Sequence, residues 1–212
     1  MEVISKPFTT KFGDRSLADL SNAMDKSAIH TFGWPIAAVL HTRNGSPKPI
    51  VNGIESRFDN EGHQEYWRLM RTGEFYFIGE LFENNRRPEC IFLDTRVNRV
   101  AETFLRAGRL FLELRVPKEE IISLLIRHGN IRGKKLAAAN PARVFFEDRA
   151  CNVEEVHSEF SIPLAEMLDP QSLKKHVHTT LRELAEMFDM FNPDKAAFTD
   201  PIVDAFISGR IA

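Results

Sequence analysis

Hydrophobic and polar residues alternate along this chain with two periods, and each period predicts a different kind of element. Near 16–28, 95–115 and 169–190, apolar positions recur with the period of a helix, which indicates amphipathic helices. Elsewhere, apolar residues alternate with polar ones or form short runs, which is typical of strands. The predicted strands span residues 3–12, 32–40, 49–58, 65–71, 74–82, 121–127, 143–147 and 156–162.

The order of these elements predicts the fold class. Strands gather in blocks between long helices instead of alternating with them one by one, which is the pattern of an α+β fold. We therefore predict a single domain over residues 1–212, with a curved, mainly antiparallel sheet and two or three long amphipathic helices packed on it. In the last predicted strand, Val156, Phe160 and Ile162 point one way and His157, Glu159 and Ser161 point the other, so one face of the sheet is expected to meet water.

Local signals mark where the helices begin and end. Ser16 precedes the first helix and Asp19 follows three residues later, which is the spacing of a capping box. Asp169 and Pro170 are a typical N-cap and first helical residue for the last long helix. Pro117 ends the central helix because proline lacks the backbone N–H that a helix interior requires.

The composition is that of an ordinary globular protein, with 43% hydrophobic and 27% charged residues. Phenylalanine is abundant, at 17 residues, against two tryptophans and two tyrosines. Because its ring carries no polar group, most of these side chains are expected in the core. Cys90 and Cys151 belong to no CxxC pair, which favours a reducing compartment, and we predict a cytoplasmic protein.

The net charge of −2 excludes a strong overall attraction to nucleic acid or acidic membranes. Binding of such a partner would require a local basic patch. The first residues, MEVISKPFTTKF, lack the apolar core of a signal peptide. No stretch approaches the roughly 18 apolar residues of a membrane-spanning helix, so no membrane partner is predicted.

The chain contains none of the compact motifs that mark common enzymes. GxGxxG, GxxxxGK[ST], HExxH and GxSxG are all missing from the sequence. His176 and His178 lie in a predicted helix, where two residues of separation turn the side chains about 200° apart. They therefore cannot share a metal ion, and we predict neither a metal site nor a cofactor.

The segment RHGNIRGKK at residues 127–135 combines cations, a histidine and two glycines at the end of an apolar strand. Glycines allow backbone N–H groups to approach an anion, and arginine or lysine can hold a phosphate. The alternative is a solvated hairpin loop whose charges keep the strand soluble. The candidate contact residues here are Arg127, His128, Arg132, Lys134 and Lys135.

Aromatic residues supply a second set of candidates. Trp34 lies in the stiff segment FGWP, and Tyr66 and Trp67 are adjacent in a hairpin that also contains FYF. These three rings could stack on a ligand. The alternative is that these rings anchor the core. If the outer face of the hairpin is aromatic as well, a second copy of the chain or a partner protein is expected to cover it.

Four arginines recur along the central helix, namely Arg96, Arg99, Arg106 and Arg109. A row of cations on a helix can bind a polyanion. However, Glu102 lies four residues before Arg106 and Glu113 lies four residues after Arg109, which is the spacing of ion pairs within a helix. We interpret the row as a solvated helix face, because such pairs are common on exposed helices.

A distinctive pattern joins residues 28–36 (AIHTFGWPI), 73–83, and 91–96 with the helix that follows, and the RHG of residues 127–129 lies beyond it. Residues 28–133 thereby resemble a poorly characterised bacterial domain found behind a DNA-binding-like domain of the Schlafen/AlbA type. The resemblance implies an accessory or sensing module linked to bacterial regulation or defence. It implies no inherited DNA binding, because the DNA-binding-like module is not part of this sequence.

Three hypotheses about function follow. The first is a non-catalytic binding or sensing module that recognises an anionic ligand, either a nucleotide or nucleic acid, through the basic loop, or that binds a partner protein or a second copy. The second is a hydrolase or nuclease that uses His128 or His41 with Asp94 or a nearby glutamate. The third is a structural subunit of a larger assembly, which would expose a large apolar patch.

Overall fold

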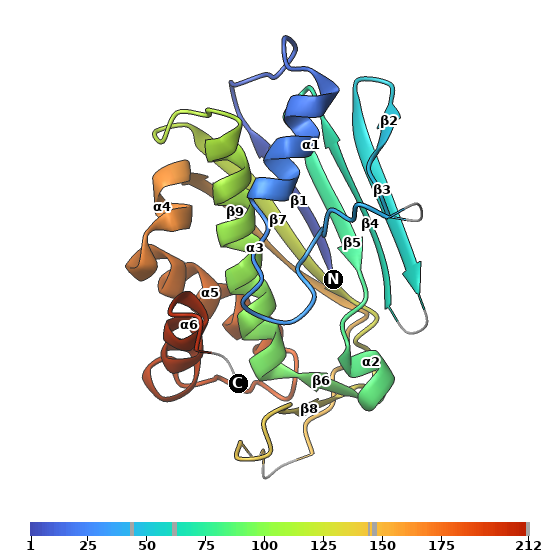
Figure 1. Cartoon of the computed structure of the whole chain (residues 1–212). Helices are drawn as coiled ribbons and strands as arrows, with labels where there is room; N and C mark the ends of the chain where they lie inside the picture. Colours follow the sequence, from blue (N-terminus) through green and yellow to red (C-terminus); the bar gives the residue numbers. More distant parts are fainter. Residues whose placement is uncertain (43–44, 61–62, 144, 146–147, 211–212) are drawn as a thin grey trace.

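The computed structural model describes residues 1–42, 45–60, 63–143, 145 and 148–210. Its centre is a seven-stranded antiparallel sheet in the order β2-β3-β4-β5-β1-β7-β9 (Figure 1). The strands are β1 (Glu2–Pro7), β2 (Lys48–Ile50), β3 (Gly53–Asn60), β4 (His63–Met70), β5 (Phe75–Gly79), β7 (Ile121–Gly129) and β9 (Glu155–Pro163). The predicted α+β class with a mainly antiparallel sheet is confirmed.

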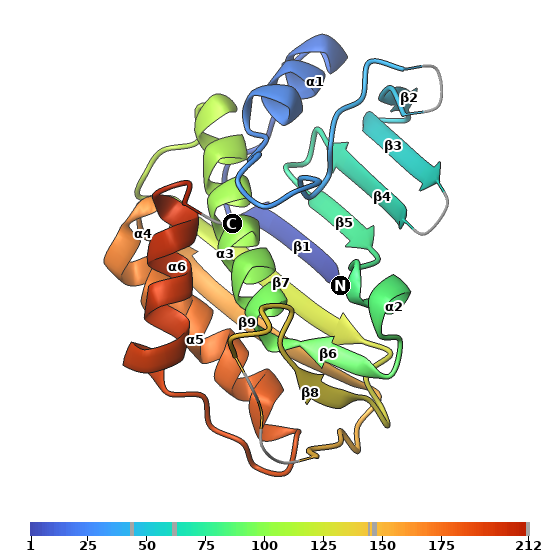
Figure 2. The same cartoon turned by 60° about the horizontal axis from the view of Figure 1, so that its bottom comes forward.

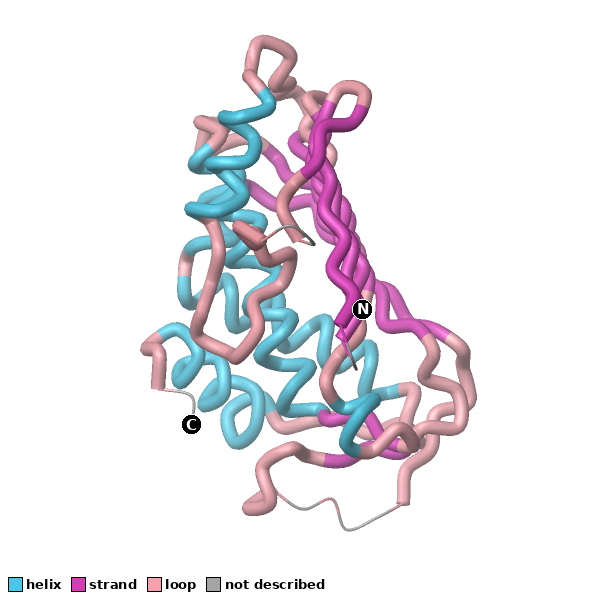
Figure 3. Tube along the Cα trace, turned by 45° about the vertical axis from the view of Figure 1, so that its right-hand side comes forward, coloured by secondary structure: helices cyan, strands magenta, loops and turns pink. Residues whose placement is uncertain are grey.

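The helices gather on one face of this sheet, as the edge-on view in Figure 3 shows. They are α1 (Leu17–Lys26), α3 (Leu93–Glu113), α4 (Leu164–Leu168), α5 (Pro170–Glu186) and α6 (Asp200–Ile207). A π-helical turn, η1 (Lys195–Thr199), precedes α6. At one end of the sheet, Figure 2 shows the short helix α2 (Glu83–Arg86) beside a small parallel pair, β6 (Cys90–Phe92) and β8 (Lys135–Ala137).

The predicted helix starts are present in atomic detail. The Ser16 hydroxyl accepts from the Asp19 backbone N–H, and an Asp19 carboxylate oxygen accepts from the Ser16 N–H, which completes the capping box. Asp169 accepts from the Ser172 N–H at the start of α5. These bonds satisfy backbone donors that have no partner within the helix, so local sequence sets these boundaries.

Strand β1 holds the two halves of the sheet together. It pairs with β5 on one side and β7 on the other, so that Val3 lies opposite both Phe77 and Ile126. Each fully buried side chain of this kind stabilises the fold by about 1.5–3 kcal/mol. The same register puts Glu2 opposite Arg127 on the face without helices.

Two predicted strands have a different structure. Residues 32–40 form a loop, because Gly33 and Ala37 have positive φ angles of 60° and 52° that interrupt an extended chain. The predicted strand at 49–58 is the hairpin β2–β3, which turns at Asn52, where φ is also positive. The predicted strand at 143–147 falls largely outside the described residues, since 144, 146 and 147 are not among them.

The last predicted helix, 169–190, is shorter than expected, and α5 ends at Glu186. The chain after it packs against the core: Ile202, Val203 and Phe206 of α6 are buried. One hydrophobic cluster of described residues includes side chains from β1 through to α6.

The arginine row on α3 is the largest correction. Arg96, Arg99 and Arg106 are 4%, 7% and 1% exposed, and only Arg109 lies at the surface as expected. The solvated-face interpretation is therefore wrong for three of the four arginines. The cause is tertiary packing: the sheet covers one side of α3, and the loop before β2 crosses another side. The sequence of the helix alone does not reveal either contact.

Candidate functional site

Buried charged side chains of α3 hold residues 33–38, which we call the crossing segment. Arg99 Nη1 donates to the Trp34 carbonyl oxygen at 2.8 Å, and Arg106 Nη2 donates to the Ala37 carbonyl oxygen at 3.0 Å. The Ile36 N–H donates to Glu102 Oε1 at 2.7 Å. The backbone of this segment thus pairs with side chains instead of a neighbouring strand, which explains why it is not a strand.

Strand β4 completes this anchor from the other side. The Ala38 N–H donates to Glu65 Oε1 at 3.2 Å, and Trp67 Nε1 donates to the Ala38 carbonyl oxygen at 3.0 Å. Trp67 is 0% exposed, so it has no ring surface on which a ligand could stack. The predicted ligand-stacking role of Trp67 therefore does not fit this position, and the residue anchors the core.

Trp34 differs, because about a third of it (37%) is exposed. Its ring stacks on Phe58 with the centroids 4.8 Å apart, and its indole N–H donates to Glu65 Oε2 at 3.2 Å. His63 Nε2 lies 3.3 Å from the same carboxylate oxygen. Trp34 therefore contacts two residues, Phe58 and Glu65, that line a cavity, and it does not line that cavity itself.

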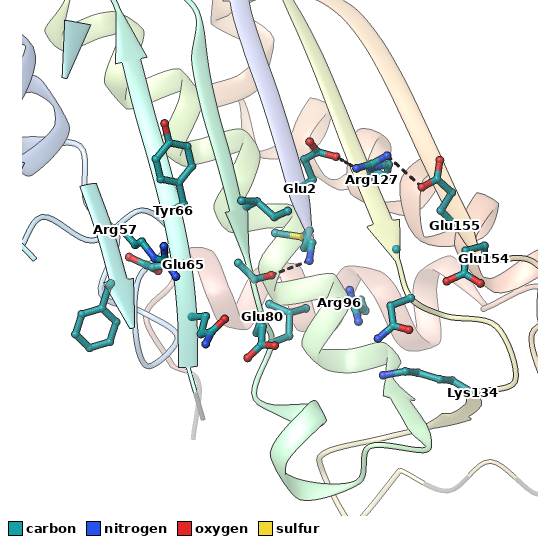
Figure 4. A pocket seen from close by; sticks show the side chains of 18 residues that line it. Glu2, Arg57, Glu65, Tyr66, Glu80, Arg96, Arg127, Lys134, Glu154 and Glu155 are labelled. Carbon is teal, nitrogen blue, oxygen red and sulfur yellow. Dashed lines mark hydrogen bonds and ion pairs between the residues drawn. The ribbon is translucent and has the colours of Figure 1, made fainter. Parts of the chain in front are cut away.

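This cavity has a volume of about 570 Å³ and lies where the central strands end beside the first turn of α3 (Figure 4). Three of the sequence-predicted contact residues line it: Arg127 from β7, Lys134 from the loop after β7, and Tyr66 from β4. Residues that are distant in the sequence therefore converge here. We take this cavity as the candidate functional site and call it the sheet-end cavity.

Arg127 is held between two carboxylates on neighbouring strands. It forms ion pairs with Glu2 of β1 and with Glu155 of β9, the latter at 3.1 Å. Tyr66 donates its hydroxyl to Glu55 Oε2 at 2.8 Å. Burial, together with this hydrogen bond, raises the pKa of Tyr66, so the phenol stays protonated at neutral pH.

His128 is not part of the loop. It ends the buried face of β7 at 1% exposure, and its Nδ1 lies 3.1 Å from Arg96 Nη1. Arg96 Nη2 also pairs with Glu83. Because an arginine always donates, His128 accepts at Nδ1 and is neutral; burial, and then the Arg96 charge, lower its pKa well below 6.5.

Arg96 connects this buried cluster to the sheet-end cavity, which it lines. Three polar atoms of the cluster have no hydrogen-bond partner among the described residues: Arg96 Nε, Glu83 Oε2 and His128 Nε2. Buried polar atoms usually have a partner, because leaving one unpaired is costly. Figure 4 shows the Lys134 side chain extending toward Arg96, and burial lowers the pKa of Lys134.

The remaining cations of the basic loop do not line the sheet-end cavity. Arg132 lies 3.8 Å from Glu154, and Lys135 Nζ lies 2.8 Å from Asp148 Oδ2. Both are surface ion pairs. The structure thus divides the five predicted loop residues into two that line the cavity, one that lies behind it and two that face solvent.

The histidine–carboxylate pairs of the enzyme hypothesis do not come together. His41 is largely exposed and lies 3.7 Å from Asp25. The Asp94 carboxylate accepts from the backbone N–H groups of Ala139 and Asn140, each at 2.9 Å, and it does not contact His128. Over the described ranges, no group of three or more His, Cys, Asp or Glu side chains is placed to hold a metal ion.

Charges of both signs surround the cavity. The lining cations are Arg57, Arg96, Arg127 and Lys134, and the lining carboxylates are Glu2, Glu65, Glu80, Glu154 and Glu155. Sequence reasoning singled out Arg96 but placed it in solvent, and it missed Glu83 and Glu65. Their contacts span 13 and 31 residues of chain, and no local pattern signals contacts of that kind.

The described part of the chain contains no helix with the length and apolar character needed to span a membrane. Comparison of the sequence with protein-family models, and of the chain with curated proteins and solved structures, found no match. The resemblance of residues 28–133 to the Schlafen/AlbA-associated domain therefore stays a prediction, and the geometry of the site is the basis for any function assigned to this protein.

Proposed function

We propose that this protein is a non-catalytic binding module that recognises a small zwitterionic molecule in the sheet-end cavity. The observation that carries the proposal is the cavity itself, where Arg127, Lys134 and Tyr66 meet the buried Arg96. Its volume of about 570 Å³ lies within the range of about 300–1,000 Å³ typical of small-molecule sites.

The charges favour a ligand with groups of both signs. Lys134 and Arg96 offer donors for an anionic group, and the unpaired Arg96 Nε gives such a group a buried target. Glu80 lines the same cavity and is exposed, so it is available to an ammonium group. Charge-assisted hydrogen bonds of this kind are stronger than neutral ones, so they would determine how the ligand lies.

A polyanion such as nucleic acid suits the cavity less well. Arg127 is already bracketed by Glu2 and Glu155, and the outer cations of the loop pair with nearby carboxylates. Binding a phosphate chain would bring it against these carboxylates, and nucleic-acid sites instead concentrate unpaired cations on one surface. The resemblance of residues 28–133 is compatible with a sensing role in bacterial regulation.

The test is a thermal-shift and calorimetric screen of the whole chain against single amino acids, nucleoside monophosphates and a single-stranded oligonucleotide. We expect an amino-acid-type ligand to raise the melting temperature. Lys134→Gln should weaken its binding about tenfold, which corresponds to the loss of one charge-assisted bond worth about 1.4 kcal/mol.

Arg132→Gln is the matched control, because it removes a cation from the same loop that does not line the cavity. Equal losses in the two variants would contradict the proposed site. Binding of the oligonucleotide in preference to every small molecule would contradict the proposed ligand class.

A further inference from the structure

A second cavity, of about 560 Å³, lies on the other side of the first turn of α3. Arg96 lines the sheet-end cavity, whereas Asp94, Thr95 and Asn98 line this one, and the two cavities share no lining residue. Residues 139–143 and α6 close its other sides, in the region where Figure 2 shows α6 and the β6–β8 pair near the start of α3. We call it the α3–α6 cavity.

Two buried polar groups of this cavity lack partners. Thr95 is 1% exposed and Asn98 is 6% exposed, and neither Thr95 Oγ1 nor Asn98 Oδ1 has a hydrogen-bond partner among the described residues. Asn98 Nδ2 donates to the Asp94 carbonyl oxygen at 3.0 Å, which fixes the amide and leaves Oδ1 as a free acceptor. Both residues line the cavity, so a ligand with an N–H group and a second polar group would satisfy them.

The charge of the lining favours an anion. Arg86, Arg143 and Arg210 line the cavity, and Asp94 is its only carboxylate among the described residues. The two Asp94 oxygens accept from the backbone N–H groups of Thr95, Ala139 and Asn140, and one of them lies 3.7 Å from Arg143. This carboxylate is therefore already compensated, in part by Arg143, and three arginines against one carboxylate leave the lining with an excess of two positive charges.

The wall of the cavity is aromatic. Phe32 and Phe82 both line it, with their ring centroids 6.3 Å apart. The Arg86 guanidinium lies over the Phe82 ring, 5.7 Å from its centroid, so the cation and the aromatic ring form one stacked pair in the wall. Aromatic side chains and arginine planes are the surfaces on which proteins stack single bases.

From these observations we propose that the α3–α6 cavity binds a nucleoside monophosphate. The base packs against Phe82, its N–H groups donate to Asn98 Oδ1, and the phosphate lies among the three arginines. Thr95 Oγ1 supplies the second hydrogen bond. This site is separate from the sheet-end cavity and does not depend on the function proposed for that cavity.

The test is isothermal titration of the whole chain with AMP, GMP, CMP and UMP, and with adenosine and inorganic phosphate separately. At least one monophosphate should bind, and both the nucleoside and phosphate alone should bind at least tenfold more weakly. Absence of binding by all four monophosphates would overturn the proposal. Inorganic phosphate that binds as tightly as the nucleotide would overturn the assignment of the base.

Thr95→Val is the most informative variant, because it keeps the shape of the side chain and removes a hydroxyl that has no partner among the residues that the structure describes. Its melting temperature should be unchanged or higher, while nucleotide affinity falls about fivefold or more. Arg210→Gln should reduce affinity about tenfold and weaken the dependence of binding on salt. Unchanged affinity in both variants would place the nucleotide elsewhere.

Two controls keep this result distinct from the sheet-end cavity. Arg87→Gln changes the exposed neighbour of Arg86, which pairs with Glu89 and does not line the cavity, so nucleotide affinity should stay the same. Lys134→Gln should also leave it unchanged. A nucleotide that loses affinity in Lys134→Gln and not in Thr95→Val binds in the sheet-end cavity, which would contradict the inference.

Discussion

The loop at 127–135 and helix α3 each carry four cations in the sequence, yet they have opposite environments in the fold. In the loop, Arg132 and Lys135 face water and pair with surface carboxylates. On the helix, Arg99 and Arg106 are buried and donate to the backbone of the crossing segment. The same residue type is a solvated charge in one region and part of the internal framework in the other.

The difference shows that burial, and not the number of cations, decides how much a charged side chain contributes to the free energy of unfolding. A surface ion pair contributes about 0–1 kcal/mol, because water screens it and the side chains lose freedom. Removing one partner from a buried pair costs about 3–5 kcal/mol, because the other charge stays buried without compensation.

The largest expected effect is on Glu102, which is 0% exposed and compensates Arg99. Glu102→Ala should lower the free energy of unfolding by about 3–5 kcal/mol, measured by urea denaturation, because it leaves buried arginines without a counter-charge. Arg109→Ala, at an exposed position of the same helix, should change it by no more than about 0.5 kcal/mol. Similar losses in the two variants would refute the difference between the two sides of α3.

An intermediate effect is expected from acid. The pKa of His128 is lower in the folded chain than in the unfolded chain. Below about pH 6.5, His128 therefore binds a proton in the unfolded chain but not in the folded chain. Stability should therefore fall as the pH drops from about 6.5 to 5, by up to about 2 kcal/mol from this residue. His128→Gln should flatten the decline in that window, whereas His157→Gln, exposed on β9, should not. If the free energy of unfolding depended on pH in the same way in the wild type and in His128→Gln, burial of a neutral His128 would not be the cause of the decline.

The smallest expected effect lies in the loop. Arg132→Ala should alter the free energy of unfolding by less than about 0.5 kcal/mol, because its pair with Glu154 is 3.8 Å long and solvent-exposed. Thermal unfolding at low and high salt is the measurement, and salt should reduce even this small difference. A loss comparable to that of Glu102→Ala would mean that the loop, too, has a structural role.

Much of the fold could be predicted because its signals are local. The spacing of Ser16 and Asp19 predicted the start of α1, and the apolar period predicted α3. The crossing segment could not be predicted: its apolar residues resemble a strand, but Ala37 adopts a positive φ and its carbonyl pairs with Arg106, 69 residues away.

The candidate site was predictable only in part. Arg127, Lys134 and Tyr66 were identified from their chemistry, and the fold brings them together in one cavity. The role of Arg96 was not predicted, because its partners Glu83 and His128 belong to other elements, α2 and β7. Nothing within a helix reveals what packs against it.

The amino-acid sequence by itself determined the starts of α1 and α5, the strand pattern of most of the sheet and the α+β class, because each depends on residues within a few positions of one another. Only the tertiary structure decided which charges are buried, which aromatic residues are core, and which residues share a cavity. Those outcomes depend on pairing such as that of β1 with both β5 and β7, and the free energy of such contacts is realised only once the chain has closed on itself.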